Sequence, residues 1–293
     1  MINTLIQGIL LGGYYALIAA GLTFMFQVMR IINLAHGSLA VLAAYALFWL
    51  AQNYHINPFV GLLIVLPAMA VLGFLLQWLV LDRSIRAGQL VPILATFGLA
   101  IVIDNGLFEA FGANTRSLGN FIGSLSYDSI ELPGKIFVGE LAVGTFVVAV
   151  LVLGGLQLFL NFTPFGRAIR ATSEDADTAG LVGINARLVN GAAAAIALAT
   201  VGIAGAALGM RGTFDAYSGG AQLLFAFEAA VIGGAGSVWG TLLGGIVLAL
   251  AQSIGATISP LGFLIAGHSV FLIVLFARIW LAGGLSGLLG RRS

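Results

Sequence analysis

A short charged segment stands out in a very apolar chain. Residues 165–186, FGRAIRATSEDADTAGLVGINA, contain two arginines and three acidic residues, whereas only 8% of the whole chain is charged. Thr163 followed by Pro164 is typical of a helix N-cap with proline at the first helical position. A capped, polar helix suits contact with another protein, so we expect this segment to dock on a partner.

The second half of the segment carries further helix signals. Thr172 and Asp175 have the spacing of a capping box, and Gly183 is placed to end a helix. Between these signals the pattern predicts a helix of about ten residues, too short to cross a bilayer and marginal alone in water. The alternative is a solvated loop whose arginines only obey the positive-inside rule, although that rule requires no acidic residues.

A second candidate site lies where an apolar run begins. The sequence INLAHG places Asn33, His36 and Gly37 at the start of a short helix. The N-terminus of a broken membrane helix presents free N–H groups to a cavity, which suits a carboxylate. We therefore expect these residues on the substrate pathway. The alternative is a plain turn in which His36 bonds to the backbone.

Acidic residues within apolar runs are costly and indicate function. Glu228 lies in the middle of LLFAFEAAVIGG, where it could line the pathway or meet a substrate ammonium group. The alternatives are a structural pair with Arg211 or His268, or a protonated carboxyl group bonded between helices. Asp104 and Glu109 are assigned to a wet outer mouth or to packing.

The remaining motifs predict structure and no catalysis. The three histidines lack ligand spacing, cysteine is absent, and neither H-E-x-x-H nor G-x-S-x-G occurs, so no metal or catalytic site is expected. His268 is interpreted as a histidine bonded between helices. Gly236, Gly240 and Gly244 recur every fourth residue, which indicates close helix packing.

Membrane helices must position these residues. The chain is 60% hydrophobic with a mean hydropathy of +1.09, and continuous apolar runs favour helices over barrel strands. We expect an all-α polytopic membrane protein of about nine transmembrane helices (eight to ten), some short or broken, with a short cytoplasmic coupling helix. The predicted spans are 4–28, 33–52, 58–81, 89–111, 137–161, 188–211, 220–236, 240–258 and 261–283.

The basic residues predict the orientation, because those that flank the spans fall on one side of a nine-span alternation. They are Arg83, Arg86, Arg167, Arg170, Arg187, Arg278, Arg291 and Arg292. That side is therefore cytoplasmic and holds the coupling segment, residues 164–187. The loop 113–136 is external, and by parity so is the N-terminus. Residues 1–293 form one domain, with only short connections that leave no room for an ATP-hydrolysing domain.

A faint internal repeat is present. MRIINLAHGSLAVLAAYA, from Met29, is similar to MRGTFDAYSGGAQLLFAFEAA, from Met210. Transporters are often built from repeats. A parallel duplication would place both copies on the same side of the membrane, against the alternation above, so chance similarity stays open.

Several stretches resemble permeases of ABC importers. DTAGLVG, Asp177 to Gly183, resembles the E-A-A-x-x-x-G loop of these permeases, with Asp in place of Glu and Thr in place of the first Ala. Four stretches resemble the branched-chain amino acid ABC permease family: residues 12–45, 166–171, 182–185 and 230–245. Gln27 stands where that family commonly has glycine. The resemblance covers nearly the whole chain in the expected order.

The resemblance implies a non-catalytic permease subunit of a bacterial inner-membrane ABC importer. Such a subunit moves branched-chain or other small amino acids by alternating access, without a cofactor of its own, while separate subunits hydrolyse ATP. The implied partners are a second homologous permease, two ABC ATPase subunits and a periplasmic binding protein; no nucleic acid is expected. The residues expected to couple the permease to the ATPases are Gly166, Arg167, Arg170, Asp177, Ala179, Gly183 and Ile184.

Two other functions stay open. Members of the same family also carry urea, amides and other small polar solutes, so the resemblance does not fix the cargo. An ion-coupled secondary transporter would use intramembrane carboxylates or broken helices as cation sites, and Glu228 and Asp104 are the candidates. That alternative gives no reason for the capped coupling segment.

Overall fold

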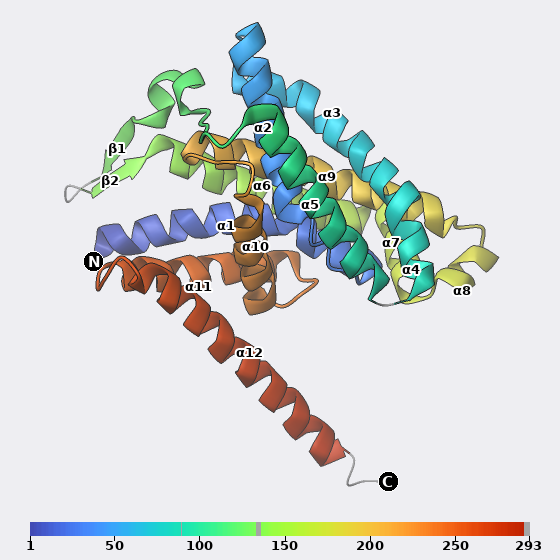
Figure 1. Ribbon diagram of the computed structural model, residues 1–293. Coiled ribbons are helices and arrows are strands. Elements are labelled where there is room, and N and C mark those ends of the chain that lie inside the picture. Colours follow the sequence, from blue (N-terminus) through green and yellow to red (C-terminus); the bar gives the residue numbers. More distant parts are fainter. Residues whose placement is uncertain (89, 133–135, 290–293) are drawn as a thin grey trace.

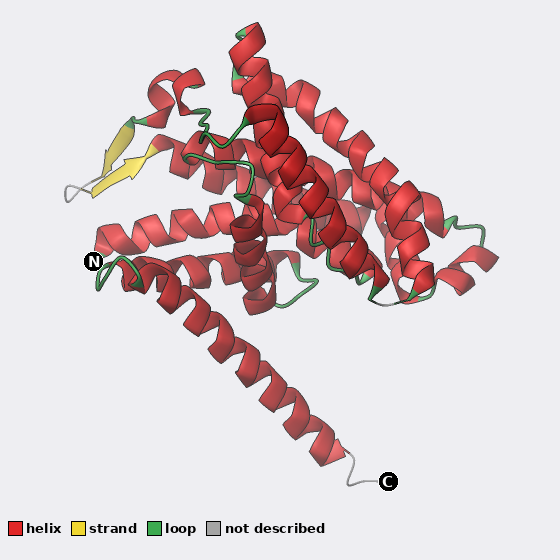
Figure 2. Ribbon diagram, viewed as in Figure 1, coloured by secondary structure: helices red, strands yellow, loops and turns green. Residues whose placement is uncertain are grey.

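The protein is a bundle of helices with one small β hairpin (Figure 1, Figure 2). The computed structural model describes residues 1–88, 90–132 and 136–289. The helices are α1 Ile2–Met29, α2 His36–Tyr54, α3 Pro58–Leu76, α4 Asp82–Ala87, α5 Val91–Phe111, α6 Glu140–Phe162, α7 Pro164–Glu174, α8 Ala176–Leu181, α9 Ala186–Arg211, α10 Gly219–Gly233, α11 Val238–Ala256 and α12 Gly262–Leu289. A π-helical segment, Gln77–Leu81, joins α3 to α4, and strands β1 Ser129–Leu132 and β2 Ile136–Gly139 pair antiparallel.

The prediction of an all-α polytopic membrane protein is confirmed. Among the described residues, seven helices are long and apolar enough to cross a membrane: α1, the continuous helix from Pro58 to Ala87, α5, α6, α9, α11 and α12 as far as Leu281. Each of the nine predicted spans coincides with a helix. Two of these helices are not long and apolar enough to cross a membrane by themselves: α2 is less apolar, and α10 has only 15 residues. They match the expectation that some spans are short or broken.

Helix α1 is the centre of the bundle and packs along α11, α9, α6 and α10. Small residues allow these helices to approach closely, which is the main source of helix association in lipid. A Cβ atom at Gly12 would overlap the backbone of Ile246 in α11, and one at Gly245 would overlap the carbonyl of Gly12. The backbones of α1 and α11 are therefore in direct contact.

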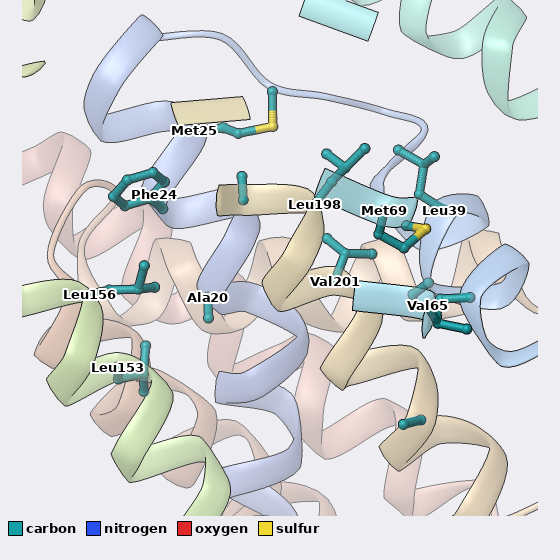
Figure 3. Close-up of a cluster of buried hydrophobic side chains, with 14 of the residues drawn as sticks. Ala20, Phe24, Met25, Leu39, Val65, Met69, Leu153, Leu156, Leu198 and Val201 are labelled. Atoms are coloured by element: carbon teal, nitrogen blue, oxygen red, sulfur yellow. The ribbon is translucent and has the colours of Figure 1, made fainter. Parts of the chain in front are cut away.

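Several helices fill the core beside this contact. Figure 3 shows side chains from α1, α2, α3, α6 and α9 there: Phe24, Met25, Leu39, Val65, Met69, Leu153, Leu156, Leu198 and Val201. Because lipid tails are as apolar as these side chains, close packing contributes more here than the exclusion of water. Helix α12 contacts α11 and α10 and then leaves the body of the bundle (Figure 1).

The two ends of the bundle differ. Gln7, near the start of α1, donates a hydrogen bond to the carbonyl of Phe137 in β2 at 3.0 Å. Helix α6 starts beside this hairpin and carries the chain to α7 and α8 at the far end (Figure 1). The N-terminus and residues 113–132 and 136–139 thus share one end, here called the outer end, and the coupling segment lies at the inner end. This separation agrees with the alternation predicted from the arginines.

Candidate functional site

Two broken helices begin in the middle of the bundle. The His36 Nε2 atom, in the first turn of α2, lies 2.7 Å from the carbonyl oxygen of Ile18, near the midpoint of α1. A Cβ atom at Gly37 would overlap the carbonyl of Gly219, the first residue of α10. A Cβ atom at Gly219 would lie 2.7 Å from the backbone nitrogen of Ser38. The N-termini of α2 and α10 therefore touch at mid-depth.

From this contact the two helices run in opposite directions (Figure 1). The ring of Phe48, in the second half of α2, packs against Phe121 in the outer segment, with centroids 6.1 Å apart. The last turn of α10 packs against the start of α11, where Gly233 and Gly240 meet. Helix α2 thus reaches the outer end and α10 the inner end, and together they form one interrupted span.

The two similar stretches of sequence run in opposite directions in the bundle. Helix α1 runs to the inner end, and residues 30–35 bring the chain back to mid-depth, where α2 begins. Helix α9 runs to the outer end, where the Gly209 carbonyl accepts from Leu118, and residues 212–218 return to mid-depth. The two similar stretches therefore begin at opposite ends of the bundle. They are arranged as an inverted pair and not as a parallel one, so their similarity does not conflict with the predicted alternation.

The polar residues predicted at the start of α2 hold the returning chain. Asn33 is buried; its Oδ1 accepts from the Ala35 N–H at 3.0 Å, and its amide contacts the sulfur of Met25. His36 is also buried and bonds to the backbone, as in the alternative interpretation from the sequence. These two side chains contact α1 and the residues just before α2. Gly37 has no side chain, which allows the backbone of α2 to approach α10.

A polar patch that the sequence did not predict lies on one side of the contact. The Tyr217 side chain is 54% exposed, and its hydroxyl donates to Asn105 Oδ1 in α5 at 3.3 Å. The carboxyl group of Asp104 lies beside the Ser38 hydroxyl, and its Oδ1 is buried without a hydrogen-bond partner among the described residues. We call Ser38, Asp104, Asn105 and Tyr217 the crossing patch.

The first turn of α10 is open. Ser218, its N-cap, makes no side-chain cap bond, because its hydroxyl pairs with Asp215 at 2.9 Å. Nothing lies within 4 Å of the position that a Cβ atom would take at Gly220. The N–H groups at the start of this helix carry partial positive charge, and the surface at Gly220 is open.

A half-buried arginine lies near α10. The Arg211 guanidinium lies over the ring of Tyr14 at 4.7 Å from the centroid, and the Tyr14 hydroxyl donates to Gln222 in α10 at 2.9 Å. Arg211 Nη1 is buried and has no hydrogen-bond partner in the part of the chain described here. The predicted alternative of an Arg211–Glu228 pair is therefore wrong.

Glu228 ties α10 to α12. Its side chain is 1% exposed, and its Oε1 lies 2.5 Å from Nδ1 of His268. The Arg278 guanidinium donates to the Ile232 carbonyl of α10 at 3.1 Å, which adds a second link between the same helices. The structure thus gives Glu228 the paired arrangement with His268 that the sequence left as an alternative.

The predicted helix of the coupling segment is two helices. Thr163 caps α7, accepting from the Gly166 N–H at 2.9 Å, as predicted. The capping box is wrong: Thr172 lies inside α7, and its hydroxyl donates to the Ile169 carbonyl at 2.9 Å. Asp175 interrupts the helix and caps α8, accepting from the Asp177 N–H at 3.0 Å.

The end of α8 is as predicted. Gly183 has a φ of 84°, the left-handed conformation that ends a helix, and Ile184 N–H bonds back to the Ala179 carbonyl at 3.1 Å. At the start of α8, the Thr178 hydroxyl and backbone N–H groups bond to Asp175 and hold the pKa of its carboxyl below the ordinary value. The carboxylate cap therefore persists throughout the neutral range.

The seven predicted coupling residues divide into two groups. Gly166 and Ala179 are buried, and Gly166 sits where any side chain would overlap the last carbonyls of α6. Ile184 is half-buried, whereas the others are exposed: Arg167, Arg170, Asp177 and Gly183. The sequence analysis missed Leu181 and Val182, which are 88% and 75% exposed at the tip. Two exposed apolar side chains therefore lie beside exposed charged residues at the tip of this segment.

The glycine repeat packs helices at two of its three positions. Cβ atoms at Gly240 and Gly244 would overlap the backbone of α10, so both bring α11 against that helix. Gly236 lies instead in the turn before α11, with a φ of 89°. The spacing could not distinguish a glycine needed for close packing from one needed for a turn.

A multi-pass bundle with two opposed half-helices at its centre and a capped polar segment at one end defines a membrane permease. The chain belongs to the family of branched-chain amino acid transport system permease components, whose pattern matches residues 4–282. It is therefore a non-catalytic transmembrane subunit of an ABC transport system, in a family that binds no cofactor itself and is homologous to bacterial inner-membrane permeases. Membership implies ATPase and binding-protein partners.

Individual relatives are similar over almost their full length. The chain is 29% identical to the high-affinity branched-chain amino acid transport system permease protein BraD of Pseudomonas aeruginosa, over 88% of this chain and 87% of the relative. It is 30% identical to the probable branched-chain amino acid transport permease protein LivH of Methanocaldococcus jannaschii, over 91% and 86%. Identity to LivH of Escherichia coli K12 is 26%, over 87% and 86%. No solved structure matches the chain.

Proposed function

We propose that this chain is one half of a permease pair that carries a branched-chain or other small apolar amino acid by alternating access. The observation that supports this most directly is the contact between the N-termini of α2 and α10 at mid-depth. The uncapped first turn of α10 provides N–H groups and a partial positive charge for the substrate carboxylate. Discontinuous helices bind anionic substrate groups in this way in other transporters.

An apolar pocket beside this turn suits the substrate side chain. It measures about 490 Å³, and it is lined by Ile32, Leu34, Ile93, Gly220, Leu223, Leu224 and Phe227. Gly220 belongs both to this pocket and to the first turn of α10. A branched aliphatic side chain can fill the pocket while its carboxylate meets the helix. Urea has no apolar group and acetamide only a methyl group, so the pocket favours an amino acid with a branched side chain.

The exposed face around α10 is expected to be buried against another subunit. Asn105 and Tyr217 are exposed at a depth where polar groups facing lipid are costly. A second, homologous permease packed on this face would enclose a pathway between the two subunits. We propose further that two ABC ATPase subunits bind α7 and α8 at the inner end, and that a periplasmic binding protein delivers the amino acid at the outer end.

Uptake into proteoliposomes tests this function. The whole complex, with the second permease, ATPases and binding protein, is expected to accumulate radiolabelled leucine only when ATP is present, and to accumulate urea and acetamide poorly. The control is this chain reconstituted alone under a sodium or proton gradient. Uptake by the chain alone would contradict the proposal and support an ion-coupled carrier. Faster ATP-dependent uptake of urea than of leucine would contradict the assignment of the substrate.

A further inference from the structure

Asp104 is an intramembrane carboxylate that forms no ion pair among the described residues. The ion pairs among the described residues join Asp82 to Arg86 and Arg187, and Glu228 to His268, and none involves Asp104. Its Oδ1 is buried and lacks a hydrogen-bond partner within the described part of the chain. Such a group inside a membrane protein is expensive and normally belongs to a site.

The neighbours of Asp104 present oxygen atoms. The Asn105 amide donates to the Ile101 carbonyl at 2.8 Å, so its Oδ1 is turned toward Tyr217. The hydroxyl oxygens of Tyr217 and Ser38 complete the patch. A carboxylate with a hydroxyl beside it and further neutral oxygen atoms on the same patch suits a group with three N–H donors and a positive charge, which is a primary ammonium group.

The patch is continuous with the site proposed for the substrate carboxylate. Ser38 lies beside Asp104, and its Oγ would lie 2.8 Å from a Cβ atom at Gly219 in the first turn of α10. In an α-amino acid only one carbon atom separates the ammonium and carboxylate groups. The patch, the first turn of α10 and the apolar pocket therefore offer adjacent places for the ammonium group, the carboxylate and the side chain.

We infer that the crossing patch is the ammonium subsite of the permease, with Asp104 binding the substrate ammonium group and Ser38, Asn105 and Tyr217 completing its shell. This inference rests on the proposed function. It assigns part of the choice of substrate to the permease itself. A solute without an ammonium group leaves the Asp104 carboxylate uncompensated and is therefore disfavoured even when it fits the pocket.

Binding by the solubilised permease pair, without its binding protein, tests the subsite directly. The probes are leucine, isopentylamine, which lacks the carboxylate, and 4-methylpentanoate, which lacks the ammonium group. Leucine and isopentylamine are expected to raise the melting temperature of the wild-type pair, and 4-methylpentanoate to raise it less. Asp104→Asn is expected to abolish the effect of isopentylamine. An undiminished isopentylamine effect in Asp104→Asn would overturn the inference.

Uptake by the whole complex gives an independent readout. Asp104→Asn is expected to lower ATP-dependent leucine uptake about tenfold or more, because a bond between charged groups is lost, and Asp104→Glu to retain part of it. Glu109→Gln is the matched control, since it removes an exposed carboxylate from the same helix and is expected to leave uptake within about twofold. Equal uptake by Asp104→Asn and Glu109→Gln would overturn the inference.

Two further measurements test the inference if the first variant fails or if a cation other than ammonium binds the patch. If Asp104→Asn does not assemble, Tyr217→Phe and Asn105→Ala take its place, and unchanged isopentylamine binding in both would overturn the inference. Replacing sodium by choline is expected to leave wild-type uptake unchanged, whereas loss of uptake would assign Asp104 to a sodium ion. Failure of ATP-dependent uptake in the wild type would reject the proposed function, while normal wild-type uptake with an unaffected Asp104→Asn would reject only the subsite.

Discussion

The coupling segment at the inner end and the crossing patch at mid-depth both hold polar side chains in a chain that has few. In the coupling segment the polar groups are satisfied locally, since Thr163 and Asp175 cap the helices that follow them. In the crossing patch they come from α2, α5 and the turn before α10, and the Oδ1 atom of Asp104 stays unpaired within the described residues. A surface whose polar groups are satisfied locally, like the coupling segment, suits a permanent protein partner. A surface with an unpaired carboxylate oxygen, like the crossing patch, suits a ligand that binds and dissociates.

The largest effect is expected at the helix contact. Gly219→Leu places a side chain on the backbone of α2 and should lower the free energy of unfolding by about 3 kcal/mol or more, with loss of uptake. Gly106→Ala is the control, because nothing lies within 4 Å of its Cβ position. Thermal unfolding in detergent measures both. Equal melting temperatures for the two variants would mean that the helix contact is not close.

At the coupling segment we expect loss of function without loss of the fold. Gly183→Arg forces a side chain into a left-handed conformation, and Asp177→Lys reverses an exposed charge beside the apolar tip. Each should reduce substrate-stimulated ATP hydrolysis in the reconstituted complex about tenfold. Gly180→Ala, at an open position of the same helix, serves as the control. Full stimulation in both variants would show that α8 does not touch the ATPase.

A smaller effect is expected at the Glu228–His268 pair, which joins α10 to α12. Glu228→Gln keeps a hydrogen bond to His268 but removes the charge, so it should cost about 1 kcal/mol of stability, leave assembly intact and slow uptake. His268→Ala combined with Glu228→Gln should cost less than the sum of the single changes. Additive effects in this double-mutant cycle would show that the pair does not hold α10 to α12.

The smallest effect concerns the cap of α8. The pKa of Asp175 is depressed in the folded protein, so its contribution is present above its unfolded value and is lost only as the pH falls through the lower folded pKa. Coupling should therefore not change through Asp175 between about pH 5 and 8. Asp175→Ala should speed amide exchange at Asp177 and Thr178 several-fold. Unchanged exchange would mean that the cap contributes nothing.

The sequence predicted the coupling segment better than the crossing patch, and the reason is the range of the interactions. The signals at Thr163 and Gly183 act on N–H and C=O groups within a few residues, so the sequence alone locates both helix ends. The break at Asp175 was missed because Thr172 can bond either to the following turn or to the preceding one. The structure has the second arrangement.

The crossing patch depends on contacts between residues far apart in the chain. Nothing near Asn105 or Tyr217 in the sequence indicates that their side chains meet, since 112 residues separate them. The similarity between the two stretches did carry a usable signal, because it aligns His36, the first residue of α2, with Tyr217, two residues before α10. An inverted repeat, unlike a parallel one, brings two such points together at mid-depth, so the sequence held enough to predict the helix contact but not the side chains around it.

The meeting of α2 and α10 gives the bundle a break at mid-depth in place of a continuous helix. Half of a typical hydrocarbon core, roughly 15 Å, lies on either side of such a point. Under the proposed alternating access, a solute bound at this break would therefore have a similar distance to travel to either compartment. The closest approach at the break is between the backbones of Gly37 and Gly219, with the Ser38 side chain beside it.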